Sequence, residues 1–466
     1  MHSPFQPDQG LSVADTVHLE ELAYTPDSCP LFERLRDLPG AALLDSAHPF
    51  TERGRFDILV ADGTADTIDE LRPGTDEAGV TAWFQQLTGQ LQDAVGTVSP
   101  VAEELPFCGG LLGMLNYDAG QALNHLDDHS DASGTSAQVR AYRWAVVQDH
   151  LRRKSVLATL PRVGPRERSA LLRRLRQPSR QAASSFGLTS RFQSNLSDED
   201  YHRAFARIQT YIHDGDCYQV NLAQRFTAAY EGDPWLAYKR LRAVAAAPFS
   251  AYLEGGDSAI LCLSPERFLA LHGHRVETSP IKGTRPRYED RRQDEAACRE
   301  LRESEKDRAE NLMIVDLLRN DLGRSCVPGS IHVDRLFEIQ SFPTVHHMVS
   351  TISGELAPGL NGVNLLRNAF PGGSITGAPK RRAMEIIAEL EPHARQSYCG
   401  SVFYLSADGR MDSNIAIRTL LCRGGDIHCW GGGGIIADSA WQQEYQETYD
   451  KVGAFLNALE ETLPSG

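Results

Sequence analysis

Ile415-Ala416-Ile417-Arg418-Thr419-Leu420-Leu421-Cys422 and, after four residues, Ile427-His428-Cys429-Trp430 are the most informative runs for the architecture of this chain. Both runs are apolar, and both are short enough to be buried strands. Elsewhere, strands and helices alternate irregularly, without the β-α-β period that a parallel sheet requires. We therefore predict an α+β fold with largely antiparallel sheets.

The other predicted elements follow from apolar patterning and helix-capping residues. Ser197 and Asp200 have the spacing of a capping box, which predicts a helix from there to about His213. Further helices are predicted at 79–94 and 303–318. Further strands are predicted at 41–44, 56–61, 142–148, 218–226, 259–262 and 401–405.

Composition narrows the classes of protein that fit. The chain has 466 residues and a net charge of −15, and this acidic balance argues against nucleic-acid binding. No run approaches the roughly 18 apolar residues of a membrane helix. The N-terminus lacks the basic start and apolar run of a secretory signal. The nine scattered cysteines include no Cys-x-x-Cys pair, which is typical of reduced thiols in a cytosolic protein. Residues 177–200 are polar and poor in apolar side chains, so we predict a boundary there between an N-terminal and a C-terminal portion of the chain. We call this stretch the polar seam.

Two acidic helices are the first candidates for chemistry. Asp307 and Glu310 are three residues apart and share a helix face. After Gly431–Gly434, Ser439 and Gln442 predict another capped helix, whose stripe carries Glu444, Glu447 and Lys451. Mg²⁺ prefers oxygen ligands, commonly one or two carboxylates with water and a substrate anion. The spacing alone leaves open both a metal site and a pair of solvated faces.

Two further segments carry glycine, proline and lysine in patterns that suggest a site. The run 372–380, with Pro379 near the first turn of the next helix, offers free N–H groups to a carboxylate but lacks the Gly-Lys-Ser/Thr of a phosphate loop. Lys282 lies between Pro280 and Gly283 and is either a surface residue or a positioned amine. As a nucleophile it must be neutral, and burial would lower its pKa. Glu266 is a plausible proton partner.

With these motifs in view, the sequence resembles the chorismate-binding enzymes. The resemblance covers about residues 200–456 and rests on the segments 264–268, 280–284, 309–317, 345–350, 372–380, 414–419, 432–439 and 444–448. It implies two large, mostly antiparallel sheets packed together, flanked by helices, with the active site in a cleft. It also implies an N-terminal region of the anthranilate synthase component I type at 1–185 and a catalytic domain at 195–460.

Two positions separate the members of this family. Where isochorismate and salicylate synthases carry a water-activating lysine, this chain has Gln219, so amination is favoured over hydroxylation. Where anthranilate synthases typically have alanine, this chain has Lys282, as in the aminodeoxychorismate synthase component I group. The alternatives are anthranilate synthase component I and a non-catalytic binding protein that keeps the fold. The complete set of acidic residues and lysine argues against the latter.

The resemblance implies a role for each matching residue. Lys282 is expected to attack C2 of chorismate, Glu266 to protonate the departing C4 hydroxyl, and His347 to lie near the substrate. Ammonia then attacks C4 and expels Lys282, giving 4-amino-4-deoxychorismate. Mg²⁺ is expected on Glu310 and Glu447, with Glu444 and Asp307 behind water. The expected substrate-binding residues are Thr284, Thr376, Gly377, Tyr404, Arg418, Gly432 and Lys451. A tryptophan pocket is implied at Leu44, Ser46, Pro248, Phe249 and Ser250.

The source of ammonia is expected to be a second chain. The sequence shows no glutaminase nucleophile motif, so a glutamine amidotransferase subunit in a heterodimer is implied. The product is expected to enter 4-aminobenzoate and folate biosynthesis in the cytoplasm, with another enzyme completing 4-aminobenzoate.

Overall fold

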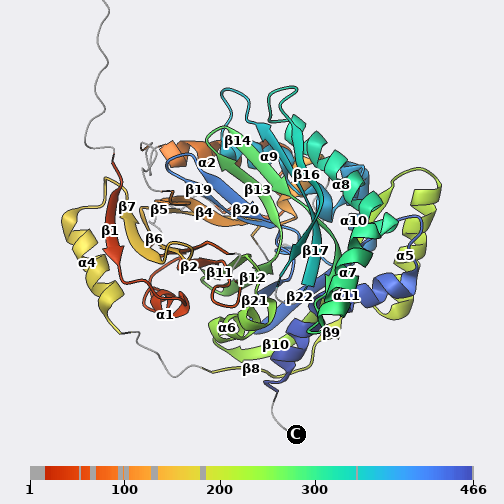
Figure 1. The fold of residues 1–466 in the computed structure, drawn as a ribbon, viewed down its shortest axis with the longest axis horizontal. Coiled ribbons are helices and arrows are strands. Elements are labelled where there is room, and N and C mark those ends of the chain that lie inside the picture. Colours follow the sequence, from red (N-terminus) through yellow and green to blue (C-terminus); the bar gives the residue numbers. More distant parts are fainter. Residues whose placement is uncertain are drawn as a thin grey trace, which may run out of the picture.

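Two antiparallel sheets form the body of the molecule in the computed structural model (Figure 1). The structure describes residues 16–51, 54–62, 70–92, 98, 104–126, 135–178, 185–342 and 345–463. Within these ranges, every pairing between named strands is antiparallel. The predicted α+β class with antiparallel sheets is confirmed. The N-terminal segment and part of the predicted seam lie outside the described residues.

The first sheet has thirteen strands among the described residues. Its main path, in spatial order, is β1 (His18–Leu22), β7 (Lys154–Thr159), β6 (Trp144–Asp149), β3 (Phe56–Val60), β2 (Ala42–Asp45), β11 (Phe249–Gly255), β12 (Ser258–Ser264), β21 (Thr419–Arg423), β22 (Asp426–Ile435), β10 (Gln219–Gly232) and β18 (Gly377–Ala378). Strands β8 (Phe186–Leu188) and β9 (Gln193–Ser194) pair with β10.

The second sheet has nine strands in the same described ranges. Its path is β15 (Ile281–Pro286), β17 (Val345–Glu355), β14 (Arg275–Ser279), β13 (Arg267–His272), β20 (Met411–Asn414), β19 (Ser401–Ser406), β4 (Gly110–Leu115) and β5 (Ala137–Tyr142), with β16 (His332–Ser341) also paired to β17. The predicted N-terminal region (1–185) and catalytic domain (195–460) each supply strands to both sheets. In the first sheet β2 pairs with β11, and in the second β4 pairs with β19. The largest apolar core cluster also mixes the two regions. The predicted region boundaries stay a prediction.

Helices cover the outside of the sheets. In Figure 1, α7 (Arg291–Glu303), α8 (Glu305–Gly323), α10 (Lys380–Leu390) and α11 (Trp441–Glu460) gather along one side, outside β17, β10 and β22. The other helices are α1 (Cys29–Phe32), α2 (Glu77–Gln90), α3 (Ala119–Leu123), α4 (Pro165–Arg176), α5 (Asp198–His213), α6 (Pro234–Ala245) and α9 (Gly362–Ala369). None of the described helices is long and apolar enough to cross a membrane.

Most predicted elements exist, and the differences have local causes. Ser197 and Asp200 form the expected capping box of α5. The predicted box of Ser439 with Gln442 is wrong, because α11 begins after Ala440 and the Ser439 hydroxyl instead donates to Glu444 at 2.6 Å. The strand predicted at 415–422 begins only at Thr419, because Arg418 adopts a left-handed conformation with φ +52°.

Candidate active site

Lys282 is the centre of a cluster of charged side chains. Strand β15 carries it, and its Nζ lies 2.9 Å from Glu310 Oε1 on α8 and 3.4 Å from the Ser374 carbonyl. Burial lowers the pKa of Lys282, but Glu310, Glu266 and Glu447 together outweigh burial and raise it. Burial thus acts on the pKa of Lys282 in the expected direction, but the pairing of the amine with a carboxylate gives a net increase.

Glu266 is a buried carboxyl group directly before β13. Its Oε1 accepts a hydrogen bond from the Ser374 hydroxyl at 2.8 Å. Burial raises the pKa of Glu266 to about 7, against the opposing effects of Ser374 and Lys282. Lys282 and Glu266 therefore both contact Ser374, which lies in a 3₁₀ turn at Gly373–Ile375. A carboxyl group with a pKa near 7 is suited to donate or accept a proton at neutral pH.

Three carboxylates converge on the glycine run of β22. A Cβ atom placed on Gly433 would lie 3.1 Å from Glu444 Oε2 and 3.5 Å from Glu447 Oε1. A Cβ atom on Gly434 would lie 3.4 Å from Glu310 Oε1. Two helices, α8 and α11, thus bring acidic side chains against a strand segment that has no side chains of its own. This oxygen-rich cradle fits the ligand preference of Mg²⁺.

Each carboxylate of the predicted metal set has a partner in the protein. Glu310 binds Lys282, Glu447 binds Lys451 at 2.7 Å, and Glu444 binds Ser439. Asp307 accepts from Arg285 at 3.1 Å. Across the described part of the chain, no three His, Cys, Asp or Glu side chains are grouped closely enough to hold a metal. Metal binding by Glu310, Glu444, Glu447 and Asp307 stays a prediction, and it requires these pairs to open.

His347 and Arg418 are close enough to influence each other electrostatically, and Arg418 also interacts with Glu266. The Thr284 hydroxyl lies 2.8 Å from His347 Nδ1, across the pairing of β15 with β17. Burial, with help from Arg418 and His346, lowers the pKa of His347 to about 3, so its ring is neutral at pH 7. No hydrogen bond or ion pair joins the Arg418 guanidinium to another described residue, although Glu266 lies close enough to interact with its charge. A partly buried, unpaired guanidinium fits a substrate carboxylate.

Thr376, Gly377, Gly432 and Lys451 are occupied with structural contacts. The buried Thr376 hydroxyl donates to the Gly372 carbonyl at 3.1 Å, and Lys451 Nζ donates to the Gly432 carbonyl at 2.7 Å. Gly377 has φ +145°, and a Cβ atom there would lie 2.1 Å from the Gln219 carbonyl. These contacts fix the backbone around the cluster. Their expected roles in substrate binding stay predictions.

Tyr404 lines a cavity of about 240 Å³, together with all five residues of the predicted tryptophan pocket: Leu44, Ser46, Pro248, Phe249 and Ser250. The expected role of Tyr404 in substrate binding stays a prediction. The tyrosine that does reach the glycine run is Tyr398, whose hydroxyl lies 2.7 Å from the place a Gly432 Cβ would take. No local pattern distinguished Tyr398, because its position depends on a contact with a distant strand.

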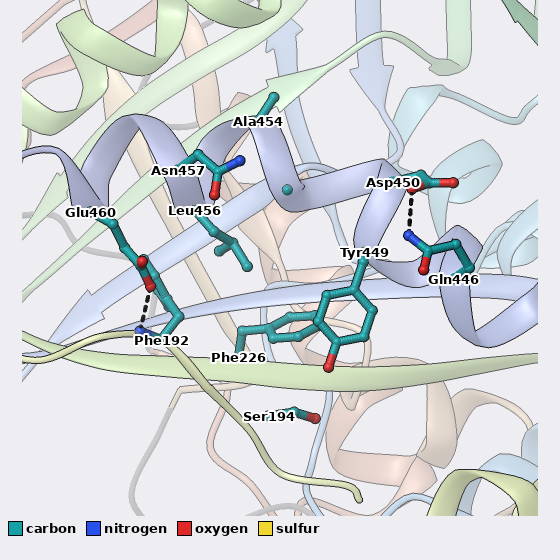
Figure 2. Close-up of a pocket in the computed structure, with 11 residues that line it drawn as sticks. Phe192, Ser194, Phe226, Gln446, Tyr449, Asp450, Ala454, Leu456, Asn457 and Glu460 are labelled. Atoms are coloured by element: carbon teal, nitrogen blue, oxygen red, sulfur yellow. Dashed lines mark hydrogen bonds between the residues drawn. The ribbon is translucent and has the colours of Figure 1, made fainter. Parts of the chain in front are cut away.

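Helix α11 has a second, outward face. Figure 2 shows Tyr449, Asp450, Asn457 and Glu460 of this helix around a surface pocket of about 550 Å³, with Phe192, Ser194 and Phe226 opposite. Glu444, Glu447 and Lys451 are not among the residues that line this pocket. The helix therefore separates the charged cluster from an open surface hollow.

Comparison with known proteins identifies the family. A model described as chorismate binding enzyme matches residues 41–457. The chain belongs to the chorismate-binding enzyme family. It is 46% identical over 447 residues to aminodeoxychorismate synthase component 1 of Klebsiella aerogenes, covering 94% of this chain and 98% of that protein. It is 37% identical over 398 residues to anthranilate synthase component 1 of Streptomyces coelicolor, covering 80% of this chain and 77% of that protein.

A solved structure agrees with the fold of this family member. Anthranilate synthase component I from Streptococcus pneumoniae superposes with a TM-score of 0.73 at 28% identity, covering 87% of this chain and 92% of that one. The resemblance inferred from the motifs, to chorismate-binding enzymes and to aminodeoxychorismate synthase component I among them, is confirmed. The two antiparallel sheets flanked by helices are confirmed with it.

Proposed function

We propose that this chorismate-binding enzyme aminates chorismate at C4 and so makes 4-amino-4-deoxychorismate. The observation that carries the proposal is the position of Lys282, which is enclosed between Glu310 and Ser374 and lies beside Glu266. The 46% identity to an aminodeoxychorismate synthase component 1 over nearly the whole chain supports it. So does Lys282 itself, at a position where anthranilate synthases typically have alanine.

The residues of the cluster suit two successive displacements. Lys282 must first give up the proton that its pairing with Glu310 stabilises. Its neutral amine then attacks C2, the ring double bond shifts, and the C4 hydroxyl leaves as water with a proton from Glu266. Ammonia then attacks C4, the double bond shifts back, and the Lys282 amine departs from C2. Glu266 suits the first step because its pKa of about 7 keeps a proton available at neutral pH.

We assign substrate binding to Arg418 and the residues beside it. The unpaired guanidinium of Arg418 is the strongest candidate for a chorismate carboxylate, with neutral His347 and Thr284 at its side. Glu310 and Glu447, with Glu444 and the more distant Asp307 behind water, would hold Mg²⁺. When bound, the ion would offset the charge of the ring carboxylate and orient the ring.

Ammonia is proposed to come from a glutamine amidotransferase subunit, in a cytoplasmic heterodimer. The component 1 names of the similar proteins support a multi-component assembly. The 240 Å³ cavity around Ser46, Phe249 and Tyr404 is proposed as a tryptophan site. It has the size for one amino acid and combines aromatic rings with charged Arg267 and Asp412.

Product identity tests the proposal. Purified protein with chorismate, Mg²⁺ and ammonium at alkaline pH is expected to form 4-amino-4-deoxychorismate, identified by mass and ultraviolet spectrum. Anthranilate as the main product would overturn the assignment in favour of the anthranilate synthase alternative. Addition of an amidotransferase subunit is expected to let glutamine replace ammonium.

A further inference from the structure

A second cluster of reactive side chains lies behind the strand that carries His347. Cys298 on α7 has its Sγ 3.3 Å from His346 Nδ1 on β17. The other nitrogen of the same ring, Nε2, lies 2.9 Å from Asp294 Oδ1, one helical turn before Cys298. Nucleophile, base and orienting carboxylate therefore stand in the order that activated nucleophiles require.

The hydrogen bonds around His346 suit it to act as a base toward the thiol. Asp294 also accepts from Arg287 Nε at 2.8 Å and from the Tyr288 amide at 3.0 Å. These contacts, first of all the one from the Tyr288 amide, lower the pKa of Asp294 to about 2, so this carboxylate stays ionised. An ionised Asp294 favours the proton on His346 Nε2 and leaves Nδ1 as the acceptor. Nδ1 then faces two donors, Cys298 and the Ser341 hydroxyl at 2.8 Å.

Cys298 differs from the other cysteines of the chain in access. The other eight are buried, whereas Cys298 is only half-buried. The base that faces it comes from a different element and is itself buried, with 1% of the His346 side chain exposed. We propose that Cys298 is a modification site for small disulfides, with His346 as the base and Asp294 as its orienting partner.

The proposed step is a thiol–disulfide exchange. Cys298 Sγ attacks one sulfur of a small disulfide, so that one new S–S bond forms while the original S–S bond breaks. The thiol proton moves to His346 Nδ1, and Asp294 stabilises the imidazolium through Nε2–H. The departing thiolate takes the proton back, which leaves a mixed disulfide on Cys298. The adduct would lie against β17, one residue from His347, and on a helix that is tied to β15 by the 2.7 Å bond from Arg285 to Glu300.

Glutathione disulfide is the probe for the first test, which uses the native full chain. Intact mass and peptide mapping are expected to show one glutathione moiety per chain, on Cys298. At pH 7 the native residue is expected to react at least about tenfold faster than the same residue in the urea-unfolded chain, because only the folded chain supplies the base. A native rate no faster than the unfolded one, or adducts spread over other cysteines, would overturn the proposal.

Variants then test whether His346 acts as a base toward Cys298 or whether Cys298 reacts only because solvent reaches it. His346→Gln is expected to lower the rate of adduct formation at least about tenfold, and Asp294→Asn to lower it in the same direction. Ser341→Ala is the matched control, because it removes the competing donor to Nδ1 and is expected not to lower the rate. Circular dichroism confirms folding of each variant. Equal rates in wild type and a folded His346→Gln would show that Cys298 is merely accessible. None of these measurements depends on the amination of chorismate.

Discussion

Lys282 Nζ and Glu310 Oε1 are 2.9 Å apart, so the proposed nucleophile and a proposed metal ligand are paired with each other. The pair joins β15 to α8 at residues 28 apart in the chain. It explains why the pKa of Lys282 is raised although the side chain is largely enclosed. The same pair links metal binding to the protonation of Lys282. A Glu310 carboxylate that binds Mg²⁺ would stabilise the Lys282 ammonium less than it does in this ion pair.

Lys282→Ala is expected to abolish C4 amination, with a loss of at least about a hundredfold in rate, because the variant lacks the proposed nucleophile. Ammonia is then expected to add at C2, so any residual product is of the anthranilate type. Product mass and ultraviolet spectrum provide the measurement. Lys154→Ala, at an exposed lysine of β7, is the control. Undiminished 4-amino-4-deoxychorismate formation by the Lys282 variant would rule out covalent catalysis.

Glu310→Gln is expected to weaken Mg²⁺ binding at least about tenfold, because a charged oxygen ligand becomes a neutral one. Activity as a function of Mg²⁺ concentration and direct calorimetric titration both report the change. The exposed Glu305, on the same helix, provides the control Glu305→Gln. Chelation of metal by EDTA is expected to stop the wild-type reaction. Equal Mg²⁺ affinities of wild type and Glu310→Gln would exclude Glu310 as a ligand.

Glu266→Gln is expected to change how stability depends on pH. In the folded chain the pKa of Glu266 is about 7 rather than 4.5, so the native state binds this proton more tightly than the unfolded state. The wild type therefore loses stability as pH rises from about 4.5 to about 7, by about 3 kcal/mol relative to the Gln variant. Urea unfolding of both proteins across this window measures the difference. A constant difference would show that Glu266 titrates normally.

Gly433→Ala is expected to abolish most activity while the fold is retained. Its new methyl group would lie 3.1 Å from Glu444 Oε2 and close to Glu447, and so would displace the carboxylates of the cradle. Steady-state kinetics and Mg²⁺ titration are the readouts. Gly453→Ala on α11 is the matched control, because nothing lies within 4 Å of its Cβ position, and alanine there favours the helix by up to about 1 kcal/mol. Full activity of Gly433→Ala would argue against the cradle.

We propose that the Tyr398 hydroxyl donates a hydrogen bond to a carboxylate of chorismate. Tyr398→Phe is then expected to raise the KM for chorismate about tenfold or more, as loss of a hydrogen bond to a charged group does. Its hydroxyl reaches Gly432 beside the charged cluster. Tyr404→Phe is expected to leave this KM within about twofold, because Tyr404 lines the cavity around Ser46 and Phe249. The reverse result would assign substrate binding to Tyr404 instead.

Local sequence patterns predict helices and strands well where the contacts that stabilise them join residues close in sequence. Ser197 and Asp200 capped α5 as expected, since a capping box involves residues only three apart. The same reasoning failed for Ser439, because the nearby carboxylate of Glu444 competes for its hydroxyl. It failed again at 415–418, where the chain bends before β21 begins.

The family, the antiparallel fold class and the candidates Lys282, Glu266, Glu310 and Glu447 could be inferred from the chain alone, because motifs and periodicity are properties of neighbouring residues. The partners of these side chains follow from the packing of the sheets and helices. The pairing of Lys282 with Glu310, the placement of Tyr404 in a cavity with Ser46 and Phe249, and the Cys298–His346 contact all join residues from separate elements. Such contacts, and the pKa values they set, depend on distances and burial that exist only once the sheets have packed.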